Sequence, residues 1–177
     1  MKNIIAILSL SIVFLLMGCV SEVSFFEAVQ NNDYELVENY ITSEDFDINQ
    51  TTKDGATALH IAVFYGHLDM VYLLLENNID SSILDGDGVS AMYTAAYLAN
   101  STIVALMLWE FNVDIFQESE FGTTAYDVVS IEFDDEFQQT YIDFGELIGY
   151  EFDLFRIEID RAIIHTMFDA YLYEINE

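Results

Sequence analysis

The fold of this chain is decided by one stretch, Gly55-Ala56-Thr57-Ala58-Leu59-His60-Ile61-Ala62, which is followed by Gly66-His67-Leu68-Asp69-Met70-Val71 and then Leu73-Leu74-Leu75. Thr57 is a favourable N-cap for a helix from Ala58 to about Tyr65, and Gly66 interrupts that helix. A second helix is expected from Leu68 to Glu76, because its apolar residues recur on one side. The stretch therefore predicts a pair of short antiparallel helices.

The same unit recurs along the chain. Asp54-Gly55-Ala56-Thr57-Ala58-Leu59-His60 returns 33 residues later as Asp87-Gly88-Val89-Ser90-Ala91-Met92-Tyr93. A third copy, Phe121-Gly122-Thr123-Thr124-Ala125-Tyr126-Asp127, lies 34 residues further on. A period of this size indicates stacked two-helix units rather than a closed globule.

These units resemble the ankyrin repeat, in which the pattern G-x-T-P-L-H-x-A is followed by a G-H pair and an apolar second helix. Alanine stands at the family's proline position in three copies, which is compatible with a first helical turn. The glycine that ends the first helix corresponds to Asn32, Gly66 and Ala99 in successive copies, with no clear counterpart around Phe133. The resemblance implies an all-α ankyrin-repeat solenoid of about four helix-turn-helix repeats, assigned to residues 25–144.

The C-terminal segment, residues 145–177, departs from the repeat pattern. We expect it to form a C-terminal helical cap, because a stack of repeats needs its last apolar face covered. A strand within residues 152–159 is the alternative. The apolar stripe expected to face the stack consists of Ile159, Ile163, Met167, Tyr171 and Ile175.

The first residues have the layout of an export signal. A positive start at Lys2 precedes an apolar run from Ile4 to Met17, which is shorter than a membrane-spanning helix requires. Leu16-Met17-Gly18-Cys19 resembles the lipobox of bacterial lipoproteins, which implies a signal peptide over residues 1–18, lipidation of Cys19 and a tether over residues 19–24. We therefore expect the protein in the bacterial cell envelope, lipid-anchored to a membrane and facing the periplasm or the cell surface.

The charge of the chain excludes several functions. Only 4 Lys and Arg oppose 32 Asp and Glu, a net charge of -28. Nucleic-acid binding is therefore excluded, because it depends on clustered basic side chains. The single Cys permits neither an internal disulfide nor a multi-thiolate zinc site. No metal or cofactor is expected.

Candidates for catalysis are weak. His60 and His67 stand where the family has structural histidines, with Thr57 as the expected partner of His60. Asp85-Gly86-Asp87-Gly88 fits a hairpin tip better than a calcium loop, because the required oxygen ligands do not follow. The acids at 132 and 134–136 leave open a hydrolase acting on wall polymers through paired carboxylates. We expect no enzyme.

Protein binding remains as the expected function. The resemblance implies a binding face made of the loop tips and the exposed side of the first helices. Rigid aromatic residues dominate the binding energy of protein interfaces, and acidic neighbours would favour a basic partner. Packing of these aromatics between repeats is the competing interpretation, and an immunity or inhibitor role against a basic toxin or hydrolase is the alternative function. The expected partner-binding residues are Lys53, Asp54, Phe64, Tyr65, Asp87, Val89, Tyr97, Leu98, Glu120 and Phe121.

Overall fold

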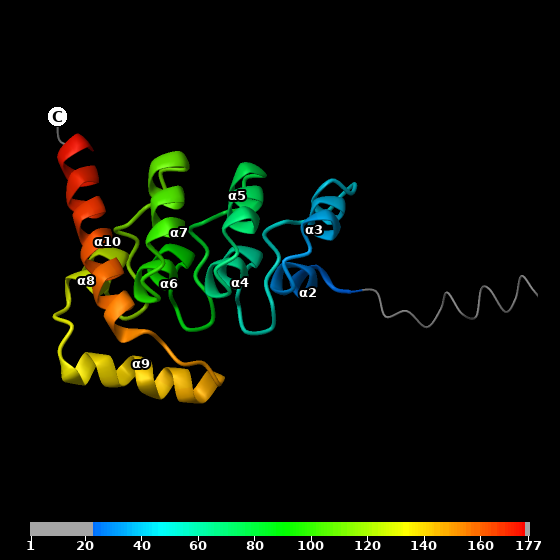
Figure 1. Cartoon of the computed structure of the whole chain (residues 1–177). Coiled ribbons are helices and arrows are strands. Elements are labelled where there is room, and N and C mark those ends of the chain that lie inside the picture. The colour runs from blue at the N-terminus through cyan, green and yellow to red at the C-terminus, as the bar shows by residue number, and fades with distance from the viewer. Residues whose placement is uncertain (1–22, 176–177) are drawn as a thin grey trace, which may run out of the picture.

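The computed structural model describes residues 23–175 as a row of helix pairs (Figure 1). First helices pack against first helices along the row, and each also packs against its own second helix. The described residues contain no strand, so the all-α ankyrin-type solenoid is confirmed and the alternative of a strand within residues 152–159 is wrong. The three complete pairs are α2 (Phe25–Gln30) with α3 (Tyr34–Ile41), α4 (Ala58–Phe64) with α5 (Leu68–Glu76), and α6 (Ala91–Tyr97) with α7 (Ser101–Ala105), which continues as the π-helical turn η1 (Leu106–Glu110).

Each first helix begins at a hydroxyl side chain. The Thr57 hydroxyl accepts a hydrogen bond from the backbone N–H of His60, as expected from the sequence. Ser24, Ser90 and Thr124 cap α2, α6 and α8 (Ala125–Ser130) in the same way. Helices this short are not stable alone in water, so both these caps, worth about 1 kcal/mol each, and packing between repeats are needed to hold them.

The turn inside each pair depends on one left-handed residue. Asn32, Gly66 and Ala99 have φ angles of 56°, 71° and 54°, and they are the positions identified from the repeat pattern. After α8 the equivalent turn is missing, because Ile131 is extended, with φ -64° and ψ 135°. The chain therefore leaves the stack after α8 instead of folding back into a second helix.

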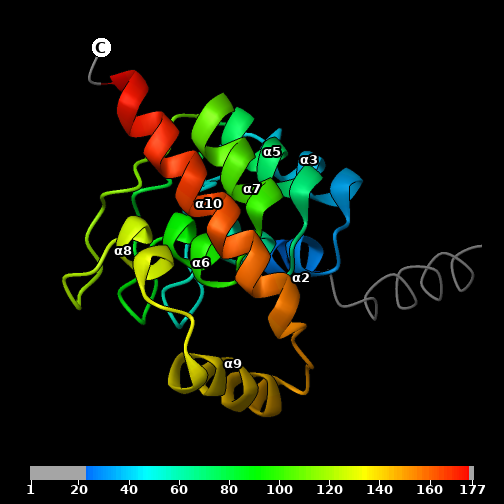
Figure 2. The same ribbon diagram turned by 60° about the vertical axis from the view of Figure 1, so that its left-hand side comes forward.

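The two last helices complete the fourth repeat in an unexpected way. α9 (Asp135–Ile148) runs back beneath α8 and α6, whereas α10 (Leu154–Ile175) crosses the stack (Figures 1 and 2). α10 packs against α7 and α8 and so takes the place of the missing second helix. The fourth repeat is α8 with α10, and α9 is an insertion between them. The expected boundary between residues 144 and 145 falls inside α9.

The face that the cap helix presents to the stack overlaps only in part with the predicted stripe. Of the expected stripe, Met167 and Tyr171 pack half-buried against the core, whereas Ile159, Ile163 and Ile175 are exposed. The buried residues of α10 include the polar pair Asp160 and Arg161, which a purely apolar pattern does not identify. The full buried set is Ile157, Asp160, Arg161, Ile164 and Phe168.

The core follows the row of repeats and ends in a smaller cluster under α9. The main core is continuous from α2 to α10 and includes Val29, Leu59, Leu74, Met92 and Ile164. The second cluster surrounds Tyr141, Ala99 and Ile157. α9 is thus attached to the solenoid through apolar packing of its own.

The expected signal peptide and the Cys19 lipidation site lie outside the described residues. Within residues 23–175, no helix combines the length and the apolar character needed to cross a membrane.

Candidate functional site

Three hairpin loops precede α4, α6 and α8 and are joined in a row. The N–H of Gly86 donates to the carbonyl of Asp54 at 2.8 Å, and the N–H of Glu120 donates to the carbonyl of Gly88 at 2.9 Å. A Cβ at Gly86 would lie 2.3 Å from the Asp54 carbonyl oxygen, so the two hairpins approach closely only because residue 86 is glycine. The predicted loop residues therefore lie on one connected edge.

The Asp85 carboxylate closes its own hairpin, as the sequence favoured. One oxygen of Asp85 accepts from the N–H of Asp87 at 3.0 Å and from that of Val89 at 3.1 Å. The carboxylate therefore shapes the turn, in the manner of an Asx turn.

Two histidines join neighbouring repeats. Nε2 of His60 lies 3.1 Å from the carbonyl of Val89, and its Nδ1 lies 2.8 Å from the Thr57 hydroxyl. Because a carbonyl only accepts, Nε2 carries the proton and Nδ1 accepts. Burial lowers the pKa of His60 below its ordinary value and outweighs the Val89 carbonyl, which acts the other way. Nε2 of His67 similarly lies 2.9 Å from the carbonyl of Gln30, so both histidines are structural.

An aromatic cluster attaches α9 to the ends of the first helices. The Tyr141 ring stacks on Tyr97 of α6 at a centroid distance of 5.1 Å, and its hydroxyl donates to the Tyr97 carbonyl. Phe144, one turn further along α9, contacts the Phe64 ring at the end of α4. Burial raises the pKa of Tyr141 to about 12, although the Arg161 guanidinium acts in the opposite direction. The tyrosine is therefore neutral and part of the core of this cluster.

A pocket of about 610 Å³ opens where α9 and α10 meet the second and third repeats. Phe64, Tyr65 and Leu98 line its repeat side, and all three are among the residues predicted to bind a partner. Tyr65 is held in place, because its hydroxyl accepts from Gln30 Nε2 at 2.8 Å and its ring stacks on His67. The other side is lined by residues of α9, α10 and the connection between them, including Phe144, Ile148, Tyr150, Phe152, Asp153, Arg156 and Asp160.

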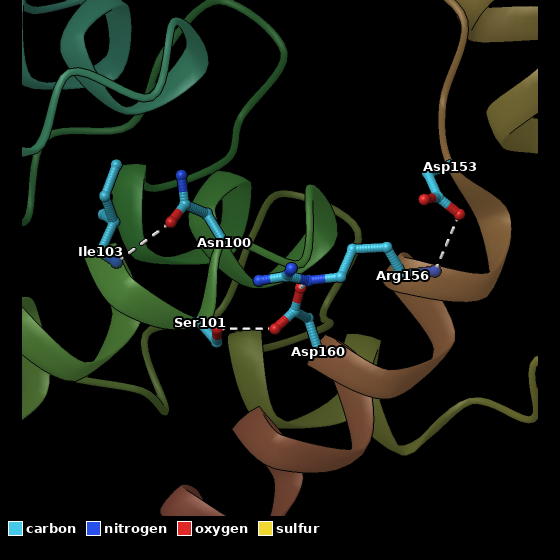
Figure 3. Close-up of polar contacts among 6 residues, drawn as sticks. All are labelled: Asn100, Ser101, Ile103, Asp153, Arg156 and Asp160. Carbon is cyan, nitrogen blue, oxygen red and sulfur yellow. Dashed lines mark hydrogen bonds and ion pairs between the residues drawn. The ribbon is translucent and has the colours of Figure 1, made fainter.

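The polar part of this pocket is built on the first turns of α10 (Figure 3). The buried carboxylate of Asp160 accepts from the Ser101 hydroxyl at 2.7 Å and pairs with Nε of Arg156. Asp153 accepts from the backbone N–H of Arg156 at 3.1 Å. Burial of a carboxylate is costly unless such partners pair with it and hydrogen-bond to it. The pocket therefore combines aromatic walls with two carboxylates and one guanidinium.

Arg161, next to Asp160, holds the inserted helix rather than a ligand. Its Nη2 donates to the carbonyls of Val128 at 2.7 Å and Ile131 at 2.9 Å. The guanidinium also lies 4.6 Å from the centroid of Phe137 in α9, within the range of a cation–π contact. The point where the chain leaves the stack is thus fixed by a residue of α10.

The structure divides the predicted partner-binding residues into two groups. Phe64, Tyr65 and Leu98 meet in the pocket, and Tyr97 lies half-buried under Tyr141. The remaining six lie on the hairpin edge and do not line the pocket. Phe121, at 75% exposure, is the most exposed of them, and Val89 is half-buried; the others are Lys53, Asp54, Asp87 and Glu120, all exposed.

Sequence reasoning missed the α9–α10 side of the pocket. One signal was present: both arginines of the chain lie only five residues apart, at 156 and 161. In so acidic a chain, two arginines on one helix indicate that their side chains bind nearby carboxylates or backbone carbonyls. The acids at 132 and 134–136 are all exposed, and Asp134 accepts from the N–H of Phe137 at 2.8 Å as the N-cap of α9.

The comparison with known families agrees with this geometry. The family described as "Ankyrin repeats (3 copies)" matches residues 25–118, which contain the three complete helix pairs and more than half of the chain. The chain belongs to the ankyrin-repeat family. Ankyrin repeats are typical of protein–protein interaction modules and are generally not catalytic. This ankyrin-repeat protein extends the matched part with α8, α9 and α10.

Several relatives match part of this chain. The Notch-regulated ankyrin repeat-containing protein of Xenopus laevis is 35% identical over 88 residues, which cover 48% of this chain and 76% of the relative. Ankyrin repeat and SAM domain-containing protein 6 of Mus musculus is 32% identical over 107 residues, 60% of this chain but 12% of the relative. Alpha-latrotoxin-Lh1a of Latrodectus hasselti is 43% identical over 61 residues, 34% of this chain and 4% of the relative. This chain thus spans only a small part of most of these relatives.

Proposed function

We propose that this ankyrin-repeat protein binds a basic protein partner through the pocket between α9, α10 and the second and third repeats, with the hairpin edge as a second contact. The observation that carries the proposal is the convergence of Phe64, Tyr65 and Leu98 with the α9–α10 connection around one pocket. Aromatic side chains held in fixed positions bind with a small loss of conformational entropy. Tyr65 is such a residue, because Gln30 and His67 already fix its ring.

The charges of the surface favour a basic partner. Of the three basic residues from 23 to 175, Arg161 is buried and Arg156 is paired with Asp160, so Lys53 alone remains as an unpaired exposed cation in this part of the chain. Asp54, Asp87 and Glu120 are exposed on the hairpin edge. A strongly negative surface accelerates the approach of a positively charged protein, and salt weakens that effect.

We further propose that the protein is a lipoprotein of the bacterial cell envelope, anchored through Cys19. The support is the arrangement of Lys2, the apolar run and the Leu16-Met17-Gly18-Cys19 motif. Cys19→Ser should abolish incorporation of labelled fatty acid and release the protein from the membrane fraction. Retention of the label by this variant would contradict the assignment.

Site-specific photo-crosslinking in cells that express the full chain tests the binding proposal. A photoreactive phenylalanine analogue replaces Tyr65 in one variant and, as a matched control, Tyr72 in another, since Tyr72 is similarly exposed but lies on the second helix α5. We expect one crosslinked protein of basic isoelectric point at position 65, with a yield that falls in high salt. Equal crosslinking at both positions, an acidic product, or no product at position 65 would overturn the proposal.

The matching loss-of-function variant is Tyr65→Ala combined with Tyr150→Ala. The sequence alone recommends Tyr97 as the second position, but Tyr97 stacks on Tyr141 and its removal would detach α9. Tyr150 lines the pocket and is 61% exposed, so its truncation leaves the core intact. We expect weaker capture of the partner with unchanged helical circular dichroism.

A further inference from the structure

The outward face of α10 is apolar although the chain carries 32 acidic residues. On the inward face, Ile157, Ile164 and Phe168 are buried in the core. On the opposite face, Phe155 is 73% exposed and Tyr173 is 67% exposed. An exposed apolar stripe opposite the buried face of a helix normally packs against another element. The outward face of α10 is therefore a surface that lacks a partner among the described residues.

The exposed residues follow the spacing of a helix-packing seam. Ile159, Ile163, Thr166, Ala170 and Tyr173 succeed one another at intervals of four, three, four and three residues. This alternation keeps side chains on one line of a helix and is the spacing by which two helices interlock. The seam contains small residues at its centre, which permit the close approach of another helix.

A groove of about 560 Å³ runs along this seam. Its floor is formed by Ile159, Ala162, Ile163, Thr166, Met167 and Ala170, and Trp109 of η1 forms its wall. None of these side chains is charged. The groove shares no residue with the pocket described above.

Three exposed carboxylates are the immediate sequence neighbours of groove residues. Glu158 and Asp169 precede lining residues of α10, and Glu110 follows Trp109 in η1. Asp169 accepts from the Tyr126 hydroxyl at 2.9 Å and lies 3.2 Å from Nδ1 of His165, so it is held on the side of α10 that faces α8. A second copy of this chain would bring acidic edges against acidic edges, which is unfavourable. A helix with lysine or arginine at its edges would be attracted instead.

We propose that the groove of α10 and Trp109 is a second docking surface, which accepts an amphipathic helix of a partner protein with an apolar seam and basic edges. The seam from Ile159 to Tyr173 corresponds to about 21 Å of helix, or roughly four turns on the partner. The surface is independent of the pocket and does not depend on the function proposed for it.

Trp109 is the single tryptophan of the chain and therefore reports directly on the groove. The probe is a designed peptide of about 15 residues with leucine and alanine in the seam and lysine at both edges. A matched peptide carries glutamate at the same edges. On titration with the lysine peptide in low salt, we expect the fluorescence of Trp109 to shift to shorter wavelength, with an affinity at least tenfold higher than for the glutamate peptide.

The variants Ile163→Asp and Leu147→Asp complete the test. Both positions are exposed, so both variants should keep the circular dichroism of the parent. Ile163→Asp should lower the affinity for the lysine peptide at least tenfold, whereas Leu147→Asp on α9 should leave that affinity unchanged. No shift with the lysine peptide, or equal binding of both peptides, overturns the proposal. A parent dimer in sedimentation that Ile163→Asp dissociates, or the same shift with neutral phosphatidylcholine vesicles, assigns the groove to another occupant and overturns it as well.

Discussion

Replacement of Tyr141 by alanine should destabilise the protein strongly, because this residue attaches α9 to the solenoid. Tyr141 has 0% exposure, and its ring contacts those of Tyr97, Phe133, Phe137 and Phe152. Truncation of a fully buried aromatic residue costs about 3–5 kcal/mol. The loss should appear in global unfolding, since α9 lies between α8 and α10 in the chain and both helices belong to the fourth repeat.

Urea unfolding followed by circular dichroism at 222 nm measures this change. The matched control is Tyr150→Ala, which removes a tyrosine near the same cluster that is 61% exposed. We expect the control to stay within about 0.5 kcal/mol of the parent, as surface substitutions usually do. A cost below about 1 kcal/mol for Tyr141→Ala would show that α9 does not depend on this contact, and the described pocket would lose one wall.

Three further predictions concern pH and close packing. The pKa of His60 is lowered in the folded chain, so as the pH falls the unfolded chain takes up a proton at this residue before the folded chain does, and the free energy of unfolding decreases below about pH 6.5. In urea unfolding at several pH values, the midpoint should fall less toward low pH for His60→Gln than for the parent. The pKa of Tyr141 is raised to about 12, so its contribution is present below pH 10 and is lost as the pH rises through 12; Tyr141→Phe should be less sensitive to alkali in the same assay, and equal sensitivity would contradict the burial. Gly86→Ala should lower the free energy of unfolding by about 1–3 kcal/mol, because its Cβ would collide with the Asp54 carbonyl oxygen, and a neutral effect would contradict the close approach of the hairpins.

The repeated part of the fold could be predicted from the sequence because its signals are local. Thr57 caps α4 as expected, and Asn32, Gly66 and Ala99 adopt the left-handed conformation at equivalent positions. The spacing of the motif therefore predicts both where each first helix begins and where the turn after it lies. The α5 bounds, Leu68–Glu76, agree with the prediction residue by residue.

The inserted helix could not be predicted in the same way. Its place depends on contacts between residues far apart in the chain, above all Arg161 with the carbonyls of Val128 and Ile131. The missing counterpart of the turn residue near Phe133 was visible in the sequence, but it does not show where the chain goes next. α9 is positioned by contacts of Tyr141 with the Tyr97 ring at the end of α6 and of Phe144 with the Phe64 ring at the end of α4.

The register of α10 could not be predicted from its apolar pattern either, because both faces of this helix are apolar. The buried face is selected by a polar pair, Asp160 and Arg161, whose partners lie in α7, α8 and the turn after α8. The pocket could not be predicted for the same reason, because its second wall depends on long-range packing. Phe64, Tyr65 and Leu98 were predicted as binding residues, whereas the opposite wall depends on where α9 and α10 pack.

The most direct test of the account is a hydrogen–deuterium exchange map of the protein alone and in complex with the partner crosslinked through position 65. Exchange in the complex should be slower over residues 64–66, 98–100 and 149–157, which contain lining residues from both sides of the pocket. Slower exchange confined to α3 and α5, with no change in those three segments, would contradict it.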